Sequence, residues 1–284
     1  MSDAYRHCEE LVRAADKDRF LASLFAPAEQ RDALYALYAF NVEIGRVRAA
    51  IREPMAGEIR LQWWRDALSG ERTGEAAANP VAAALLDAVA RFSLPAEPLR
   101  ELIEAHAFDL YDDPMPTLAA MEAYLRRTSC ALIEQAALAL SDNHVALDAA
   151  VLAGGLAVGI TGLLRGLPRH ASRGQLYLPV DVLERHGARL EDVLAGSATP
   201  ELRAALAELH IRAGAQLAAF EALLPRLPAS AAPAFLTVAL ARLDLMAMER
   251  ADYDPFKTIV EAPQWRRQWT LWRAARRYGR AMRG

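Results

Sequence analysis

Residues 154–170 read GGLAVGITGLLRGLPRH and lead, through a turn at Gly174, to Tyr177, Leu178 and Pro179. Residues 149–164 form a run of sixteen uncharged residues that ends just before Arg165. Such a run predicts a helix that is buried almost all round and has a polar C-terminal end. Its four glycines, at 154, 155, 159 and 162, each cost roughly 1 kcal/mol of helix stability relative to alanine. We therefore expect another backbone or a ligand to pack closely against this helix.

Apolar residues recur with the period of a helix along nearly the whole chain, and few stretches alternate as strands do. The pattern predicts an all-α protein with long helices over 27–52, 58–69, 80–92, 97–111, 117–140, 200–224 and 233–253, and a last helix from about 264. The first clear long helix is expected to start at Pro27. No linker rich in Pro, Gly or Ser divides the chain, and no period of roughly 20–50 residues recurs. Residues 1–284 are therefore expected to form a single domain.

The composition limits the protein's surroundings and partners. The net charge is −3 with acids and bases interspersed, which argues against a nucleic-acid partner. Cys8 and Cys130 lie far apart in the sequence, so a reducing compartment is expected. The first residues lack the apolar region of a signal peptide, and the longest uncharged run is shorter than the ~20 residues that span a bilayer. We expect a cytoplasmic protein, associated at most peripherally with the inner face of the membrane.

Three motifs carry a family resemblance. They are YALYAF at 35–40, LQWWR at 61–65, and TGLLR at 161–165 followed by RGQLYLP at 173–179. In order and spacing they resemble the squalene/phytoene synthase family. The resemblance implies a terpenoid-synthase-like helical bundle around a central apolar cavity, where two aspartate-rich clusters hold Mg²⁺ ions that bind the diphosphates of two prenyl substrates. Mg²⁺ takes oxygen ligands, and its charge stabilises the leaving diphosphate.

The chain departs from the family at those acidic positions. Gly45, Arg46 and Ala49 stand where the first cluster is expected, and Gly166 and His170 stand in the second. A guanidinium group repels Mg²⁺, and one imidazole does not restore the missing negative charge. We therefore predict that Mg²⁺-dependent prenyl coupling is lost, with no catalytic residue, no metal site and no cofactor. Mg²⁺ would be the cofactor only if the protein were a synthase after all.

The altered stretches have a resemblance of their own. AFNVE at 39–43, LPRH at 167–170 with Ser172 and Arg173, and PAFL at 233–236 resemble the branch of the family that serves as an assembly factor for mitochondrial respiratory complex I, together with its bacterial relatives. This resemblance implies a non-catalytic partner of a respiratory-complex subunit or assembly intermediate. Two alternatives stay open: a prenyl-diphosphate synthase of the squalene/phytoene type in isoprenoid biosynthesis, and a carrier of an isoprenoid or anionic lipid.

Candidate ligand-binding residues are expected around the cavity. They are Asn41, Glu43, Arg46, Gln62, Arg165, His170, Arg173 and Tyr177. Arg46 and Arg165 are the candidates for holding an anionic group, and the alternative is that such arginines pair with nearby carboxylates such as Glu43. Asp109, Asp112 and Asp113 form a dense acidic cluster, but they end a predicted helix, where the helix dipole disfavours a carboxylate cluster. His106 is expected to form a structural pair with Asp109.

The predicted C-terminal helix, about 264–284, is basic and rich in tryptophan. Trp265, Trp269 and Trp272 share one face, and residues 262–284 contain seven arginines and no acid. We expect this helix to dock on the bundle by its Trp face, with its Arg-rich end exposed. A helix that makes peripheral contact with a membrane surface is the alternative.

Overall fold

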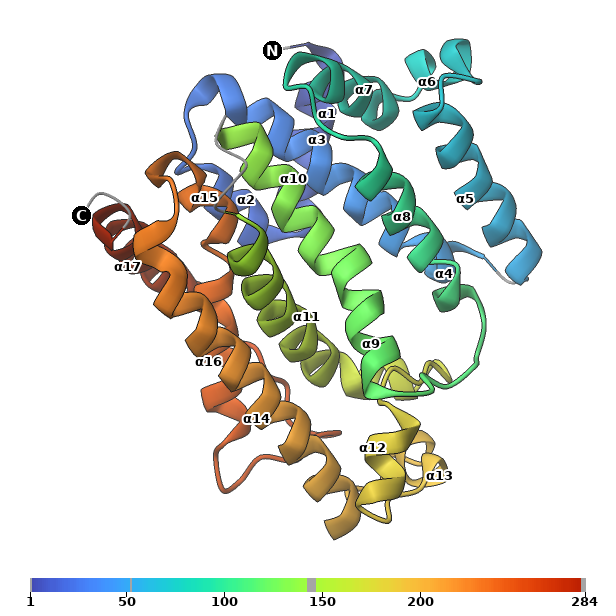
Figure 1. Cartoon of the computed structure of the whole chain (residues 1–284). Coiled ribbons are helices and arrows are strands. Elements are labelled where there is room, and N and C mark those ends of the chain that lie inside the picture. The colour runs from blue at the N-terminus through green and yellow to red at the C-terminus, as the bar shows by residue number, and fades with distance from the viewer. Residues whose placement is uncertain (1, 52, 142–146, 282–284) are drawn as a thin grey trace.

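The computed structural model describes residues 2–51, 53–141 and 147–281, and within these ranges it consists of helices and connecting segments without a strand. Figure 1 shows the helices packed as one bundle. The predicted all-α fold class is confirmed. The α-helices are α1 (Asp3–Ala15), α2 (Lys17–Ser23), α3 (Ala28–Gly45), α4 (Val47–Ala50), α5 (Pro54–Leu68), α6 (Thr73–Ala78), α7 (Pro80–Arg91), α8 (Glu97–Ala105), α9 (Leu118–Leu125), α10 (Ala131–Leu140), α11 (Asp148–Ala171), α12 (Val180–Arg185), α13 (Leu190–Leu194), α14 (Pro200–Leu223), α15 (Ala232–Phe235), α16 (Val238–Met248) and α17 (Gln264–Ala281).

Helix α11 lies at the centre of the bundle, against α10, α14, α16 and a π-helical turn, Arg126–Cys130 (Figure 1). Its glycines allow this packing. A Cβ added to Gly155 would lie 2.7 Å from the Cα of Cys130, so the two backbones approach too closely for any side chain. A Cβ on Gly154 would lie 3.1 Å from the Phe220 ring. The predicted close approach of another backbone is therefore confirmed at Gly155.

Two helices precede the first one expected from the sequence. In α1, Tyr5, Cys8 and Val12 form the buried stripe, and α1 packs on α3 and α7. Asp16 ends α1 and caps α2, because its side chain accepts a hydrogen bond from the Arg19 amide at 3.0 Å. The predicted start of the first long helix agrees with α3, which begins at Ala28 with Pro27 as its N-cap, but the sequence analysis missed the α1–α2 connection, which supplies part of the site described below.

Several long predicted helices are interrupted. The helix expected over 27–52 ends at Gly45 and resumes as α4, and the one expected over 97–111 ends at Ala105, before a 3₁₀ turn at Phe108–Leu110. The stretch 117–140 contains the π-helical turn between α9 and α10, and 233–253 is divided into α15 and α16. The parts of the helix predictions that fall on Arg52 and on residues 282–284 lie outside the described residues.

Two helical segments, Asp148–Ala171 and Ala229–Met248, are long and apolar enough to cross a membrane by length and composition. Neither is an uncharged run of the length considered in the sequence, because Arg165 interrupts the first and Arg242 and Asp244 interrupt the second. In the bundle, 72% and 67% of their most apolar windows are buried, as expected for core helices that pack against their neighbours.

Helix α17 docks on the bundle by the face opposite to the one expected. Arg267, Leu271, Ala274 and Tyr278 are its buried residues, and they contact α2, α15 and α16. The three tryptophans face solvent: Trp265 is 65% exposed, Trp269 52% and Trp272 39%. The prediction that the helix docks by its Trp face was wrong, because a charged residue, Arg267, anchors the buried face instead.

Candidate functional site

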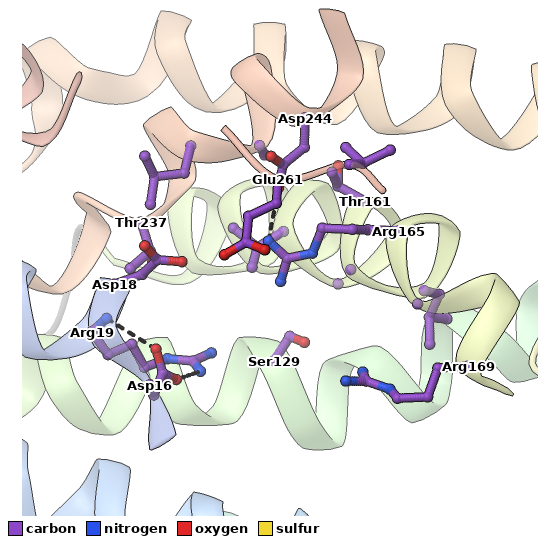
Figure 2. A pocket seen from close by; sticks show the side chains of 18 of the residues that line it. Asp16, Asp18, Arg19, Ser129, Thr161, Arg165, Arg169, Thr237, Asp244 and Glu261 are labelled. Atoms are coloured by element: carbon purple, nitrogen blue, oxygen red, sulfur yellow. Dashed lines mark hydrogen bonds and ion pairs between the residues drawn. The ribbon is translucent and has the colours of Figure 1, made fainter. Parts of the chain in front are cut away.

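A cavity of about 860 Å³ lies between the α1–α2 connection, α11, α16 and the segment 256–264 that leads into α17. Figure 2 shows its charged side, where Asp16 and Arg19 face Arg165 of α11 and Asp244 of α16. Its apolar lining includes Leu125, Leu132, Val158, Leu163 and Leu240. The predicted cavity is therefore present, and its lining combines charged and apolar side chains.

Three carboxylates on the charged side are each engaged by an arginine. Asp16 accepts a hydrogen bond from Arg19 at 2.6 Å, and Asp244 accepts one from Arg165 at 3.0 Å. Asp18 is bound by two nitrogens of Arg267, whose third nitrogen lies 3.6 Å from Asp244. The sequence indicated only Arg165 of this network.

Burial and the neighbouring arginine charges shift the pKa values of Asp16 and Asp244 in opposite directions. Burial alone would raise the pKa of Asp16, but the charge of Arg19 and its hydrogen bonds hold that pKa below the ordinary value. At Asp244 burial prevails, and its pKa is raised in spite of Arg165 and Arg267. The charged side of the cavity is therefore a set of partly buried guanidinium–carboxylate pairs.

Three of the eight predicted ligand-binding residues line the cavity. Arg165 and His170 come from α11, and Asn41 comes from α3. The Arg165 side chain binds Asp244 and keeps a relative exposure of 42%, so part of it stays accessible. The sequence motifs on α11 therefore identified two residues, Arg165 and His170, that line the cavity.

The other five predicted residues do not line this cavity. Glu43 forms an ion pair with Arg60 at 3.1 Å, and Gln62 donates to Asp66 along the exposed side of α5. Arg46 and Arg173 are exposed. Tyr177 is buried beneath the end of the cavity. The alternative weighed for the arginines, pairing with a nearby carboxylate, is observed at Arg165, which binds Asp244, whereas Glu43 binds Arg60.

An aromatic cluster closes the end of the cavity near His170. Tyr177 and Tyr124 donate hydrogen bonds to Asp109 at 2.7 and 3.0 Å, and His106 contacts the other oxygen of Asp109 at 2.5 Å. Burial, and then the Asp109 charge, raise the pKa of both tyrosines. The predicted structural pair of His106 and Asp109 is confirmed.

His170 lies over Gly166 in this cluster. A Cβ on Gly166 would lie 2.4 Å from the His170 ring, and the ring packs on Tyr177 with a centroid distance of 4.8 Å. Burial, and then the charge of Arg169, lower the pKa of His170 to about 4, so the imidazole is neutral near pH 7. The two positions where the family resemblance implies acids are thus a glycine and a neutral ring that fills the space above it.

The acidic cluster near residue 109 does not form a shared site. Asp109 is held by the aromatic cluster, whereas Asp112 forms an ion pair with Arg48 at 2.7 Å. Within the described residues, no group of three or more His, Cys, Asp or Glu side chains is arranged to hold a metal ion.

The residues present do not fit the Mg²⁺ ions that the family resemblance implies. Gly45, Arg46 and Ala49 are exposed, and Gly166 and His170 contribute no negative charge. Of the four carboxylates on the charged side, Asp16, Asp18 and Asp244 already bind guanidinium groups, and Glu261 is a single further acid, too few to replace two aspartate-rich clusters.

The sequence did carry signals for the missed residues. Asp16 follows the apolar stripe of α1 and precedes a second short helical pattern, which is typical of a helix cap. Asp244 is the one acid in the largely apolar stretch 232–248, and a buried acid in such a stretch needs a partner. Arg267 is set apart from the other arginines of α17 only by its position on the Leu271–Ala274–Tyr278 stripe.

Comparison with known sequences places these features in a family. The squalene/phytoene synthase family model matches residues 12–273. A relative from Rattus norvegicus, "NADH dehydrogenase (ubiquinone) complex I, assembly factor 6", is 33% identical over 91% of this chain and 78% of its own. A 15-cis-phytoene synthase from Synechococcus elongatus is 25% identical over 95% of this chain and 92% of its own.

Solved structures show the same fold. A dehydrosqualene synthase superposes with a TM-score of 0.84 at 18% identity, covering 96% of each chain. The squalene synthase HpnC from Alicyclobacillus acidocaldarius superposes with a TM-score of 0.75 at 25% identity, over 89% of this chain and 95% of its own. Because the family model spans nearly the whole chain and the fold agrees, this protein belongs to the squalene/phytoene synthase family.

Proposed function

We propose that this protein is a non-catalytic member of the family that assists the assembly of a respiratory complex of the NADH dehydrogenase type. The assembly-factor relative from rat supports this role at 33% identity, and that from human at 30% identity over 90% of this chain. The phytoene synthase from Synechococcus elongatus is more distant, at 25% identity. The partner would be a subunit or an assembly intermediate of that complex.

The observation that carries the non-catalytic part is the contact between Gly166 and His170. In a synthase of this family, the resemblance implies acids at these positions that hold Mg²⁺. Here the neutral His170 ring occupies the volume above Gly166, so an acid at residue 166 would collide with it. On the same helix, Arg165 binds Asp244, which occupies that carboxylate with a cation of the protein itself.

A second candidate function, a carrier of an isoprenoid or anionic lipid, rests on the cavity. Its volume of about 860 Å³ falls within the roughly 300–1,000 Å³ of small-molecule sites. The apolar part of the lining suits a hydrocarbon chain, and the accessible part of Arg165 suits an anionic head. Carriage and assembly are compatible, because a bound lipid can accompany a non-catalytic protein to a membrane complex.

The setting we propose is peripheral, on the inner face of the membrane that holds the respiratory complex. Both candidate functions fit this position, since a respiratory assembly intermediate and a lipid ligand are each found at the membrane. The two long apolar helices of the chain are largely buried within the bundle, which leaves surface contact as the means of attachment.

Two measurements test the proposal. Purified protein at stoichiometric concentration is incubated with Mg²⁺ and farnesyl or geranylgeranyl diphosphate, alongside an active phytoene synthase as the positive control. We expect no prenyl product above background, and product formation would overturn the non-catalytic assignment.

Deletion of the gene in the native host should lower the NADH oxidation of isolated membranes, with rescue by the wild-type gene. Normal NADH oxidation after deletion would overturn the assembly role.

A further inference from the structure

Helix α17 exposes an aromatic stripe along its length. Trp265, Trp269 and Trp272 follow one another at spacings of four and three residues, so they share one face of the helix. The rings of Trp269 and Trp272 stack with a centroid distance of 4.8 Å. Exposed tryptophans this close together leave a large apolar surface in contact with water, which is the mark of an interaction site.

Arginines accompany this stripe. The Arg276 guanidinium lies 4.8 Å from the centroid of the Trp272 ring, and that of Arg266 lies 5.6 Å from the centroid of Trp265. In the part of the chain that the structure describes, Arg266, Arg273 and Arg276 form no ion pair with a carboxylate, whereas Arg277 pairs with Glu221 at 3.4 Å. The cations beside the tryptophans are therefore available to an anionic partner.

The bundle holds this face in position. Arg267, on the buried side of α17, is 5% exposed and donates to Asp18 through two nitrogens. Leu271 and Tyr278 continue the same buried side. Because the helix is fixed from behind, its outward side is presented to a partner without a folding step.

We propose that the Trp face, defined as Trp265, Trp269 and Trp272 with Arg266, Arg273 and Arg276, docks this protein on an anionic lipid bilayer. Indole rings favour the headgroup region of a bilayer, where one edge is apolar and the other is hydrated. The guanidinium groups match lipid phosphates, and a basic helix with an aromatic side lies in the plane of such an interface. Charge complementarity thus favours a lipid surface.

The cavity reaches the N-terminal end of α17, because Gln264 and Arg267 line it. Arg267 belongs to the buried side of the helix, so the Trp face is a surface separate from the cavity lining.

Vesicle binding tests the inference directly. Full-length protein is sedimented with vesicles of phosphatidylcholine and phosphatidylglycerol, or of phosphatidylcholine alone, and its tryptophan emission is recorded with brominated lipid. We expect binding to the anionic vesicles, with quenching by the brominated chains. The triple variant Trp265→Ser, Trp269→Ser, Trp272→Ser should bind at least about tenfold more weakly and lose the quenching. The triple variant Arg266→Gln, Arg273→Gln, Arg276→Gln should lose the preference for the anionic vesicles.

Matched controls come from exposed apolar side chains on other faces. Ile211→Ser on α14 and Met55→Ser on α5 remove residues that are 71% and 73% exposed, and neither change should alter binding. Thermal unfolding of each variant checks that the fold is kept, as expected for exposed positions. Unchanged vesicle binding in the folded tryptophan variant would overturn the inference. A second outcome would also overturn it. If wild-type protein binds no vesicles, and the tryptophan variant is the one variant that fails to restore NADH oxidation in the deletion strain, the Trp face serves a protein partner instead.

Discussion

His170 shows how one substitution can depend on another. The ring lies in contact with Gly166 and Tyr177, and the burial that results keeps it neutral. An aspartate in its place would bring a negative charge next to Asp109, which already accepts hydrogen bonds from two tyrosines. Restoring a single acid to this end of the cavity would therefore not restore a metal site.

The buried imidazole makes stability depend on pH. Its pKa is about 4 in the folded protein against 6.5 in the unfolded chain, so between these values the unfolded state binds a proton that the folded state does not. Stability should therefore fall as pH is lowered from about 6.5 towards 4, by up to about 3 kcal/mol from this group. Urea unfolding at pH 7 and pH 5 measures the effect, and His170→Gln should remove most of it. An equal loss in wild type and variant would show that other groups cause the pH dependence.

At the scale of the element, the glycines of α11 separate into two kinds. Gly155→Ala would place a methyl group 2.7 Å from the Cα of Cys130, whereas a Cβ on Gly162 meets nothing within 4 Å. We expect Gly155→Ala to destabilise the protein by about 1–3 kcal/mol or more, because the backbones must separate. Gly162→Ala should stabilise it by about 1 kcal/mol through helix propensity. Urea denaturation measures both, and equal midpoints for the two variants would contradict this account.

The sequence predicted elements better than it predicted their faces and ends. The apolar run of α11 was long enough to be recognised, and its glycines indicated the contact with Cys130. The stripe of α1 is short and interleaved with charged residues, so α1 and the cap at Asp16 were missed. On α17 the tryptophans were taken for the docking face, because hydrophobicity alone cannot show that Arg267 finds a buried partner in Asp18.

The site was only partly predictable for the same reason. Arg165 and His170 belong to a continuous motif, and both line the cavity. Asp18 and Asp244 become site residues only when α2, α16 and α17 meet, a long-range contact that no local pattern encodes. Arg46, in contrast, follows the motif on α3 but lies beyond the end of that helix and points to solvent.

At the scale of the whole molecule, charge is distributed unevenly. The chain carries a net −3, but residues 262–284 contribute seven arginines and no acid, so the remaining residues carry −10. An anionic membrane would repel the acidic body and attract α17. The two forces together should orient the molecule, with the Trp face towards the lipid and the body towards solvent.

This asymmetry predicts how membrane binding responds to salt. The Debye length shrinks from ~30 Å at 0.01 M to ~3 Å at 1 M ionic strength, so salt screens the arginine–phosphate attraction while the tryptophan contribution persists. Binding of wild-type protein to phosphatidylglycerol-containing vesicles should weaken steadily as salt is added and then level off. In the Arg266→Gln, Arg273→Gln, Arg276→Gln variant, binding should start weaker and change less. Cosedimentation across a salt series measures both curves, and parallel curves would show that these arginines do not supply the attraction.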